Sequence, residues 1–192
     1  MTSLPLTPPQ RSALVDTSLA LLLQEQPETQ QLVDVVSAGD PGRRRLALRA
    51  LLAMRPAIPL PAELNVSLER LLAAEAAERE TVDALSLPRT EVDPRLSLWR
   101  GDITTIRADA IVNAANSTLL GCFQPLHACI DNAIHSAAGP WLRQECADIM
   151  AARDRPGSTG TATVTSGYHL PATHVIHTVG PIVQGKPTAE HE

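Results

Sequence analysis

Residues 121–139 read Gly-Cys-Phe-Gln-Pro-Leu-His-Ala-Cys-Ile-Asp-Asn-Ala-Ile-His-Ser-Ala-Ala-Gly, and no other stretch of the chain concentrates so many reactive side chains. Cys122, His127 and Cys129 lie five and then two residues apart. Thiolate and imidazole are ligands that zinc prefers, and three protein ligands with one open position are typical of a reactive zinc site. The stretch therefore predicts a zinc site at these three residues.

A simpler interpretation stands beside the zinc site. Unbonded cysteine is among the most often buried residue types, so the two cysteines could be small apolar fillers and His127 a capping imidazole. The third thiol, Cys146, has no ligand-like neighbours in the sequence. On these residues alone both interpretations stay open.

Helix geometry constrains the predicted site. Residues 129–138 have the pattern of a helix that Gly139-Pro140 ends. Positions i and i+2 do not share a helix face, so His127 and Cys129 can bind one ion only if at least one lies outside the regular helix. Pro125 suits a loop, which places Cys129 at the helix N-terminus, where the backbone N–H groups favour a thiolate or another anion.

Composition limits the class of protein. The 192 residues carry a formal net charge of −5, which gives no electrostatic case for binding nucleic acid. Three cysteines, an odd number, argue against a disulfide framework. The first residues have neither a basic segment nor an apolar run, and the apolar run at 19–23 is too short for a bilayer. We therefore expect no signal peptide, no membrane association and a cytoplasmic protein.

The amino-acid composition of the chain changes near residue 88. All the aromatic residues, histidines and cysteines lie after residue 98, whereas the first 95 residues are rich in helix formers. We expect helices at 11–26, 29–37, 41–54 and 68–85, the last capped by Asn65 or Ser67, and an extended linker at 55–61. The arginines at 43–45 are interpreted as a solvated helix face, with a binding patch as the alternative.

The second part alternates strands with helices. Strands are expected at 96–99, 109–113, 160–165 and 173–179, and helices at 129–138 and 141–152. This order indicates an α/β fold with a mixed or parallel sheet. The residues from 182 to 192 have the composition of a loop.

Four pieces of this second part resemble a known family when taken in order. They are Gly101-Asp-Ile-Thr104 after a strand, Asp109-Ala-Ile-Val-Asn-Ala-Ala-Asn-Ser117, Ile130-Asp-Asn-Ala-Ile-His-Ser-Ala-Ala-Gly139 and His174-Val-Ile-His-Thr-Val-Gly-Pro181. Each piece alone is weak, but the four in register are similar to the ADP-ribose-binding macrodomain over about residues 96–183. The resemblance implies a macrodomain-like mixed sheet flanked by helices, a three-layer α/β/α fold, behind an all-helical N-terminal extension.

The loop at 121–129 resembles one subgroup of that family. The common macrodomain has a glycine-rich loop there, and the longer cysteine–histidine loop is similar to the zinc-dependent macrodomains, hydrolases that remove ADP-ribose from proteins. The resemblance implies Zn²⁺ at Cys122, His127 and Cys129. It also implies ADP-ribose and an ADP-ribosylated protein as partners, in that subgroup a lipoyl-carrier-like protein modified by a sirtuin-type transferase.

Residue roles follow from matching the motifs. Asp102 resembles the acid that accepts a hydrogen bond from adenine, with a helix cap as the alternative, and Ile103 would offer its backbone N–H. Asn113 and Asn116 resemble the pair that contacts the distal ribose, with Asx turns as the alternative. Asp131 resembles the acid that helps to orient water, so Asn116 and Asp131 are the candidate catalytic residues. One helical turn after Asp131, His135 is expected to pack in the core.

The resemblance also sets expectations for the domains and the extent of the fold. We expect a helical extension at 1–90 and the N-terminal portion of a macrodomain at 91–192, because the family's later strand and diphosphate-binding loop have no counterpart before residue 192. On that comparison the C-terminal part of the macro fold is missing, and weak or absent activity is expected of these residues alone. The alternatives to a hydrolase are a non-catalytic ADP-ribose-binding module with a structural zinc and an inactive truncated fragment.

Overall fold

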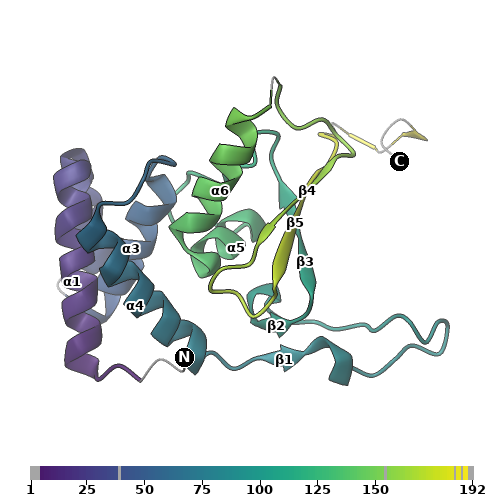
Figure 1. Cartoon of the computed structure of the whole chain (residues 1–192), viewed down its shortest axis with the longest axis horizontal. Coiled ribbons are helices and arrows are strands. Elements are labelled where there is room, and N and C mark those ends of the chain that lie inside the picture. The colour runs from purple at the N-terminus through teal and green to yellow at the C-terminus, as the bar shows by residue number, and fades with distance from the viewer. Residues whose placement is uncertain (1–4, 39, 154, 184, 187, 190–192) are drawn as a thin grey trace.

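A computed structural model of the chain describes residues 5–38, 40–153, 155–183, 185–186 and 188–189. Its N-terminal half is a bundle of helices, and its C-terminal half is a small sheet with two helices against it (Figure 1). The expectations for the chain start and for residues 182–192 fall partly on residues 1–4, 184, 187 and 190–192, which lie outside the described residues. No described helix is both long and apolar enough to cross a membrane.

The first three helices form close to where the sequence places them. They are α1 (Pro8–Glu25), α2 (Gln30–Ser37) after a 3-10 turn, and α3 (Pro41–Met54). Thr7 and Gln10 form a capping box at α1, and the Asp40 carboxylate accepts a 2.8 Å hydrogen bond from Gly42 N at the start of α3. Each cap satisfies backbone donors that the first helical turn leaves free.

The fourth helix differs from the prediction. Helix α4 is Ala62–Glu78, so it begins six residues before the expected start and ends seven before the expected end. Pro61 stands at its N-cap position and no side chain caps it there. The prediction was wrong because it required a polar cap, whereas the burial of Leu64, Leu68 and Leu71 against the other helices starts the helix earlier.

Leucines and valines of all four helices share one core. The fully or nearly buried members include Leu19, Leu22, Leu48, Leu51, Leu64, Leu68 and Leu71. The linker at 55–61 closes this bundle, because the buried Arg55 guanidinium pairs with Glu25 and donates to the carbonyls of Ile58 and Pro59. Arg43 is exposed and Arg44 forms a surface ion pair with Asp16, which agrees with a solvated helix face, whereas Arg45 is half-buried and pairs with Glu75.

The C-terminal half contains a three-stranded mixed sheet. Its strands are β3 (Ala110–Ala115), β4 (Ala162–Ser166) and β5 (His174–Val179), in the order β3-β5-β4. Strand β5 runs parallel to β3 and antiparallel to β4. The strands alternate, so Ile111, Asn113, Val175 and His177 point to one buried face.

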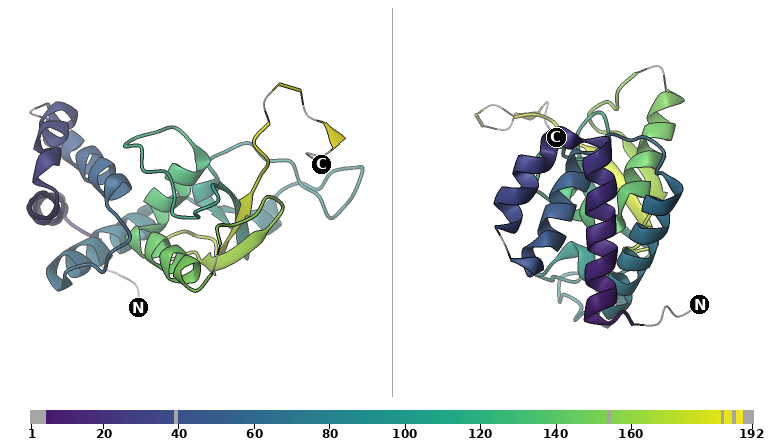
Figure 2. Two further views of the ribbon diagram at one scale, coloured as in Figure 1. Left: turned by 90° about the horizontal axis from the view of Figure 1, so that it is seen from above. Right: turned by 90° about the vertical axis from the view of Figure 1, so that its left-hand side faces the viewer.

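Helices α5 (Ile130–Ala138) and α6 (Pro140–Ala151) cover this buried face and lie between the sheet and the helical bundle (Figures 1 and 2). Gly139 separates them with φ 93°, and a Cβ there would lie 2.9 Å from Leu72 Cδ1 of α4. Among the described residues Val112 and Val164 of the opposite face are about half exposed. The mixed sheet and the preceding helices are confirmed, whereas a third layer is not found in the described part of the chain.

A second, two-stranded element precedes the sheet. Strand β1 (Val82–Asp83) pairs in parallel with β2 (Ile106–Arg107), and β1 lies before residue 90. The strand predicted at 96–99 is wrong, because Ser97 forms only an isolated bridge to Arg89 while Leu96 and Leu98 stay exposed. An alternating apolar pattern does not form a β-strand where no partner strand pairs with it. The division into domains at residue 90 stays a prediction.

Candidate functional site

The thiol of Cys129 stands at the N-terminus of α5, as the sequence predicts. Cys129 is the N-cap residue with an extended backbone, and its Sγ accepts a hydrogen bond from Asn132 N at 3.4 Å. Burial raises the pKa of the Cys129 thiol, and this backbone hydrogen bond acts in the opposite direction. A sulfur in the cap position replaces the usual hydroxyl or carboxylate, so the cap presents a soft ligand atom to the loop before the helix.

Cys122, His127 and Cys129 form one group. Their Sγ and ring nitrogen atoms all lie within 4.8 Å of one another, and Cys122 Sγ lies 3.6 Å from His127 Nδ1. Zinc–sulfur and zinc–nitrogen bonds of about 2.3 and 2.0 Å at tetrahedral angles would place such atoms roughly 3.5 Å apart. The Cys122–His127 separation matches this spacing, and the three residues could hold one metal ion. They are named the Cys122 group below.

The Cys122 group faces solvent on one side. Both cysteines are half-buried, and His127 is exposed. Three ligands leave a fourth tetrahedral position open, as in catalytic rather than structural zinc sites. The loop geometry thus agrees with the sequence argument that His127 lies outside the regular helix.

Asn116 and Gly121 hold the loop that carries Cys122. Asn116 Oδ1 accepts from Thr118 N and Oγ1 at 3.0 and 2.6 Å, and its Nδ2 donates to Gly121 O at 3.1 Å. Gly121 has φ 80°, and a Cβ there would lie 3.0 Å from the His135 ring. The Asx turn expected as an alternative for Asn116 is therefore present, and it fixes the entry to the Cys122 group.

Asn113, Asp131 and His177 form a buried polar chain beside this loop. Asn113 Nδ2 donates to Asp131 Oδ1 at 2.7 Å and lies 3.1 Å from His177 Nδ1. Burial raises the pKa of the Asp131 carboxyl, although the Asn113 hydrogen bond opposes this shift. With Asp131 ionised, the reversed amide would bring its oxygen against a carboxylate, so in that state Asn113 donates to His177 Nδ1 and the His177 proton is on Nε2.

The structure brings together a second group of residues that could hold a metal ion, and the sequence did not predict this group. His135, Cys146 and His177 are all buried, with ligand atoms within 4.8 Å of one another. His177 Nε2 lies 3.0 Å from Thr165 Oγ1 and 3.7 Å from Cys146 Sγ. A proton on Nε2 occupies the lone pair that this group would need, so the Cys122 group is the better metal site.

His135 lies in the core, as expected, but it is unusual there. Both of its ring nitrogens are buried without a hydrogen-bond partner among the described residues. Burial lowers the pKa of His135 to about 3 and that of His177 to about 4. Both rings are therefore neutral at physiological pH. Burial also raises the pKa of Cys146 to about 12, so this thiol stays protonated.

The lowered histidine pKa values predict a pH dependence of stability. Because the unfolded chain has the ordinary histidine pKa of about 6.5, it binds more protons than the folded chain below that pH. The stability from neutral His177 is thus complete above about pH 6.5 and is lost as the pH falls toward its folded pKa of about 4. We expect the urea midpoint to decrease between about pH 7 and pH 5, and to decrease less in His177→Asn. Equal decreases of the urea midpoint in both proteins would contradict the lowered pKa of His177.

Asp102 and Ile103, predicted to contact adenine, lie at the start of a short 3-10 turn. The Asp102 carboxylate accepts from Thr104 N and Oγ1 at 2.9 and 2.8 Å, which is the cap named as its alternative. Asp102 is exposed, whereas Ile103 packs partly against the core of the sheet half. The adenine contact stays a prediction.

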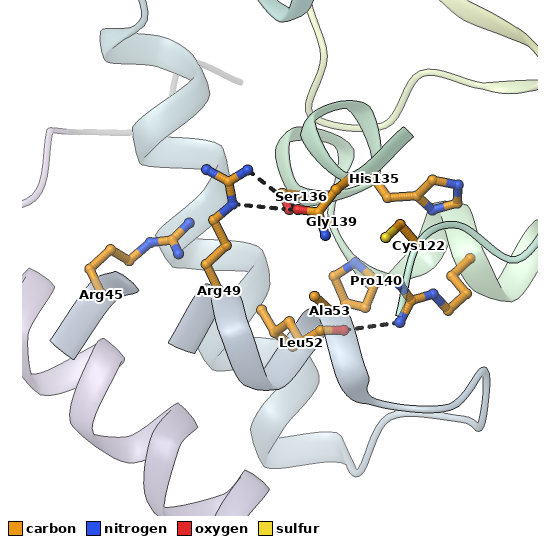
Figure 3. Close-up of a pocket in the computed structure, with 11 residues that line it drawn as sticks. Arg45, Arg49, Leu52, Ala53, Cys122, His135, Ser136, Gly139 and Pro140 are labelled. Atoms are coloured by element: carbon orange, nitrogen blue, oxygen red, sulfur yellow. Dashed lines mark hydrogen bonds between the residues drawn. The ribbon is translucent and has the colours of Figure 1, made fainter. Parts of the chain in front are cut away.

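A small pocket connects the Cys122 group to the helical bundle. It lies between α3 and α5, and Cys122, His135, Arg49 and Ser136 are among its lining residues (Figure 3). Sequence reasoning did not single out Arg49 or Arg143, which also lines the pocket. No local pattern marks them, because the pocket forms only when α3 packs against α5.

The sheet half was compared with known families. Residues 112–192 match the Macro domain family model. This match begins within β3 and includes the Cys122 group, α5, α6 and the other two strands of the sheet. The mixed α/β fold with preceding helices agrees with it.

Several curated relatives are similar to the chain. A protein-ADP-ribose hydrolase of Treponema medium is 57% identical over 91 residues, covering 47% of this chain and 35% of the relative. A protein-ADP-ribose hydrolase of Staphylococcus aureus is 41% identical over 142 residues, covering 74% of this chain and 53% of the relative. The chain thus spans about half or less of the length of these relatives.

Solved macrodomain structures are also similar to part of the chain. A Trypanosoma brucei macrodomain in complex with ADP-ribose has 33% identity and a TM-score of 0.45, covering 69% of this chain and 59% of that one. An Oceanobacillus iheyensis macrodomain has 44% identity and a TM-score of 0.39, covering 43% and 42%.

Proposed function

We propose that the chain is a zinc-dependent hydrolase that removes mono-ADP-ribose from modified proteins and releases free ADP-ribose. The observation that carries the proposal is the Cys122 group, which has the spacing of a three-ligand metal site and lies inside the segment that matches the Macro domain. The relatives named protein-ADP-ribose hydrolase support the reaction class.

The proposed reaction is a hydrolysis at the anomeric carbon of the distal ribose. Water oxygen bonds to that carbon, the bond to the protein side chain breaks, and a proton goes to the released side chain. Cys122, His127 and Cys129 would hold the zinc, which supplies a Lewis acid for a substrate oxygen or for water.

The residues around the metal group have separate tasks in this proposal. Asp131, held by the Asn113 amide at 2.7 Å, orients the water or a ribose hydroxyl. Burial raises the pKa of the Asp131 carboxyl toward neutral pH relative to an ordinary aspartate, and such a shift suits proton transfer. Asn116 keeps the Cys122 loop in place through Gly121 O. Asp102 and Ile103 would contact adenine, and Asn113 acts chiefly through Asp131, because its side chain is fully buried.

The Asn116→Ala variant tests this assignment. It removes the bonds to Thr118 and Gly121, so we expect release of ADP-ribose from a mono-ADP-ribosylated protein to slow by about tenfold under single-turnover conditions. Asn116→Asp keeps the acceptor that Thr118 uses and should slow release less. Equal rates in all three proteins would show that Asn116 does not contribute to the site. Tight binding of ADP-ribose by the zinc-loaded chain, without release from any modified protein, would instead favour a binding module.

A further inference from the structure

The pocket between α3 and α5 contains one guanidinium group, that of Arg49, that has only neutral hydrogen-bond partners. Three guanidinium groups line it, from Arg45, Arg49 and Arg143. Arg45 is neutralised, because it forms a two-pronged ion pair with Glu75 at 2.7 and 2.8 Å. No described carboxylate lies within ion-pair distance of Arg49, whereas the charge of Arg143 interacts with the Asp131 carboxylate.

Arg49 has weaker hydrogen bonds than Arg143. It donates to Ser136 Oγ and Asn132 Oδ1 at 3.2 and 3.4 Å, both neutral acceptors at long distances, and the side chain is half-exposed. Arg143 is buried and fixed by the carbonyls of Leu52, Arg55 and Leu120. In Figure 3 the guanidinium of Arg49 reaches toward Ser136, at the rim that α3 and α5 share.

The volume of the pocket limits the size of the group that it can bind. The space open to the centre of a water molecule is about 30 Å³, and one water requires about 10–15 Å³ on that scale. The pocket thus has room for a group the size of a carboxylate. Cys122 lines the same pocket, so a group held there would lie beside the proposed metal.

From these observations we propose that Arg49 binds an acidic side chain of the modified protein, next to the residue that carries ADP-ribose. This inference rests on the proposed function and extends it to the substrate class. Four of the eleven residues that line the pocket come from α3, which lies outside the residues that match the Macro domain. The α3 side of the pocket therefore suits the protein part of the substrate rather than the ADP-ribose that macrodomains share.

Binding of a peptide pair tests the proposal without turnover. Both peptides carry ADP-ribose through a non-hydrolysable linkage, with glutamates on either side of the modified residue in one and glutamines in the other. We expect wild type to bind the glutamate peptide about tenfold more tightly, the size expected for a charge-assisted hydrogen bond. Arg49→Gln should lose this preference, and Arg49→Lys should retain part of it.

Arg43→Gln is the matched control. Arg43 is exposed on the same helix but does not line the pocket, so its loss removes the same charge and should leave the tenfold preference intact. Zinc content and the affinity for free ADP-ribose should be the same in all variants. Equal affinity of wild type for the two peptides, or the same preference in Arg49→Gln as in Arg43→Gln, would overturn the proposal. The proposal would also be overturned if Arg49→Gln lost as much affinity for free ADP-ribose as it loses for the glutamate peptide.

The binding measurement separates this inference from the hydrolase proposal. If the glutamate preference depends on Arg49 but wild type releases no ADP-ribose from the matching hydrolysable peptide, the hydrolase proposal fails and the acidic-side-chain site stands. If release occurs at equal efficiency for both peptides, the hydrolase stands and the Arg49 site fails.

Discussion

Replacing Cys129 with serine should slow the release of ADP-ribose from a modified protein by at least about 100-fold, since the loss of a group that only orients a metal ligand already costs about 10–100-fold. Cys129 supplies one of three ligand atoms that lie within 4.8 Å of one another, and two ligands do not hold zinc in a folded site. The measurement is single-turnover release with the chain in excess over the modified protein.

Cys146→Ala is the matched control for the thiol. Cys146 is the third free cysteine, buried in the core of the sheet half and outside the Cys122 group. We expect it to keep zinc and release activity, with a modest loss of stability from the cavity. A Cys129→Ser chain as fast as Cys146→Ala, or a wild type whose rate a chelator leaves unchanged, would show that zinc is not catalytic.

Arg143→Met should decrease the free energy of unfolding by about 3 kcal/mol, on the order expected when charged hydrogen bonds between buried groups are lost. Its Nη1 donates to the carbonyls of Leu52 and Arg55 at 3.0 and 2.7 Å, and its Nε donates to Leu120 O at 2.7 Å. Arg143 therefore joins the end of α3 to α6 and to the loop that leads to Cys122. Burial lowers the pKa of Arg143, yet the guanidinium stays charged at neutral pH.

Urea unfolding measures this effect, with Arg153→Met as the control. Arg153 follows α6, is exposed, and donates one hydrogen bond to Thr163 Oγ1 at 2.9 Å. Its loss should change stability by less than about 1 kcal/mol. Similar unfolding midpoints for the two variants would mean that Arg143 does not join the two halves of the chain.

The sequence predicts the local elements well where end signals are explicit. Pro41 at the start of α3 and Gly139 at the end of α5 mark their helices within one residue. The placement of Cys129 at the α5 N-terminus follows from the spacing of His127 and Cys129 together with Pro125, which favours a loop before the helix. In contrast, α4 begins at Ala62 without a side-chain cap, and burial of its leucines decides its start.

The parts of the site that depend on tertiary packing could not be predicted. His135, Cys146 and His177 come from α5, α6 and β5, and their distances follow from how these elements pack. The same holds for Arg49, which meets Ser136 only because α3 lies against α5. No periodicity in the sequence records these contacts, because residues about 87 positions apart have no local pattern in common.

Zinc content per chain tests the account most directly. Elemental analysis of the purified chain should give about one zinc in wild type and in Cys146→Ala, and close to none in Cys122→Ser, His127→Ala and Cys129→Ser. The expected result follows from the Cys122 group, whose three ligand atoms lie within 4.8 Å of one another. Equal zinc content in all five proteins, or a loss confined to Cys146→Ala, would contradict the assignment of the metal to Cys122, His127 and Cys129.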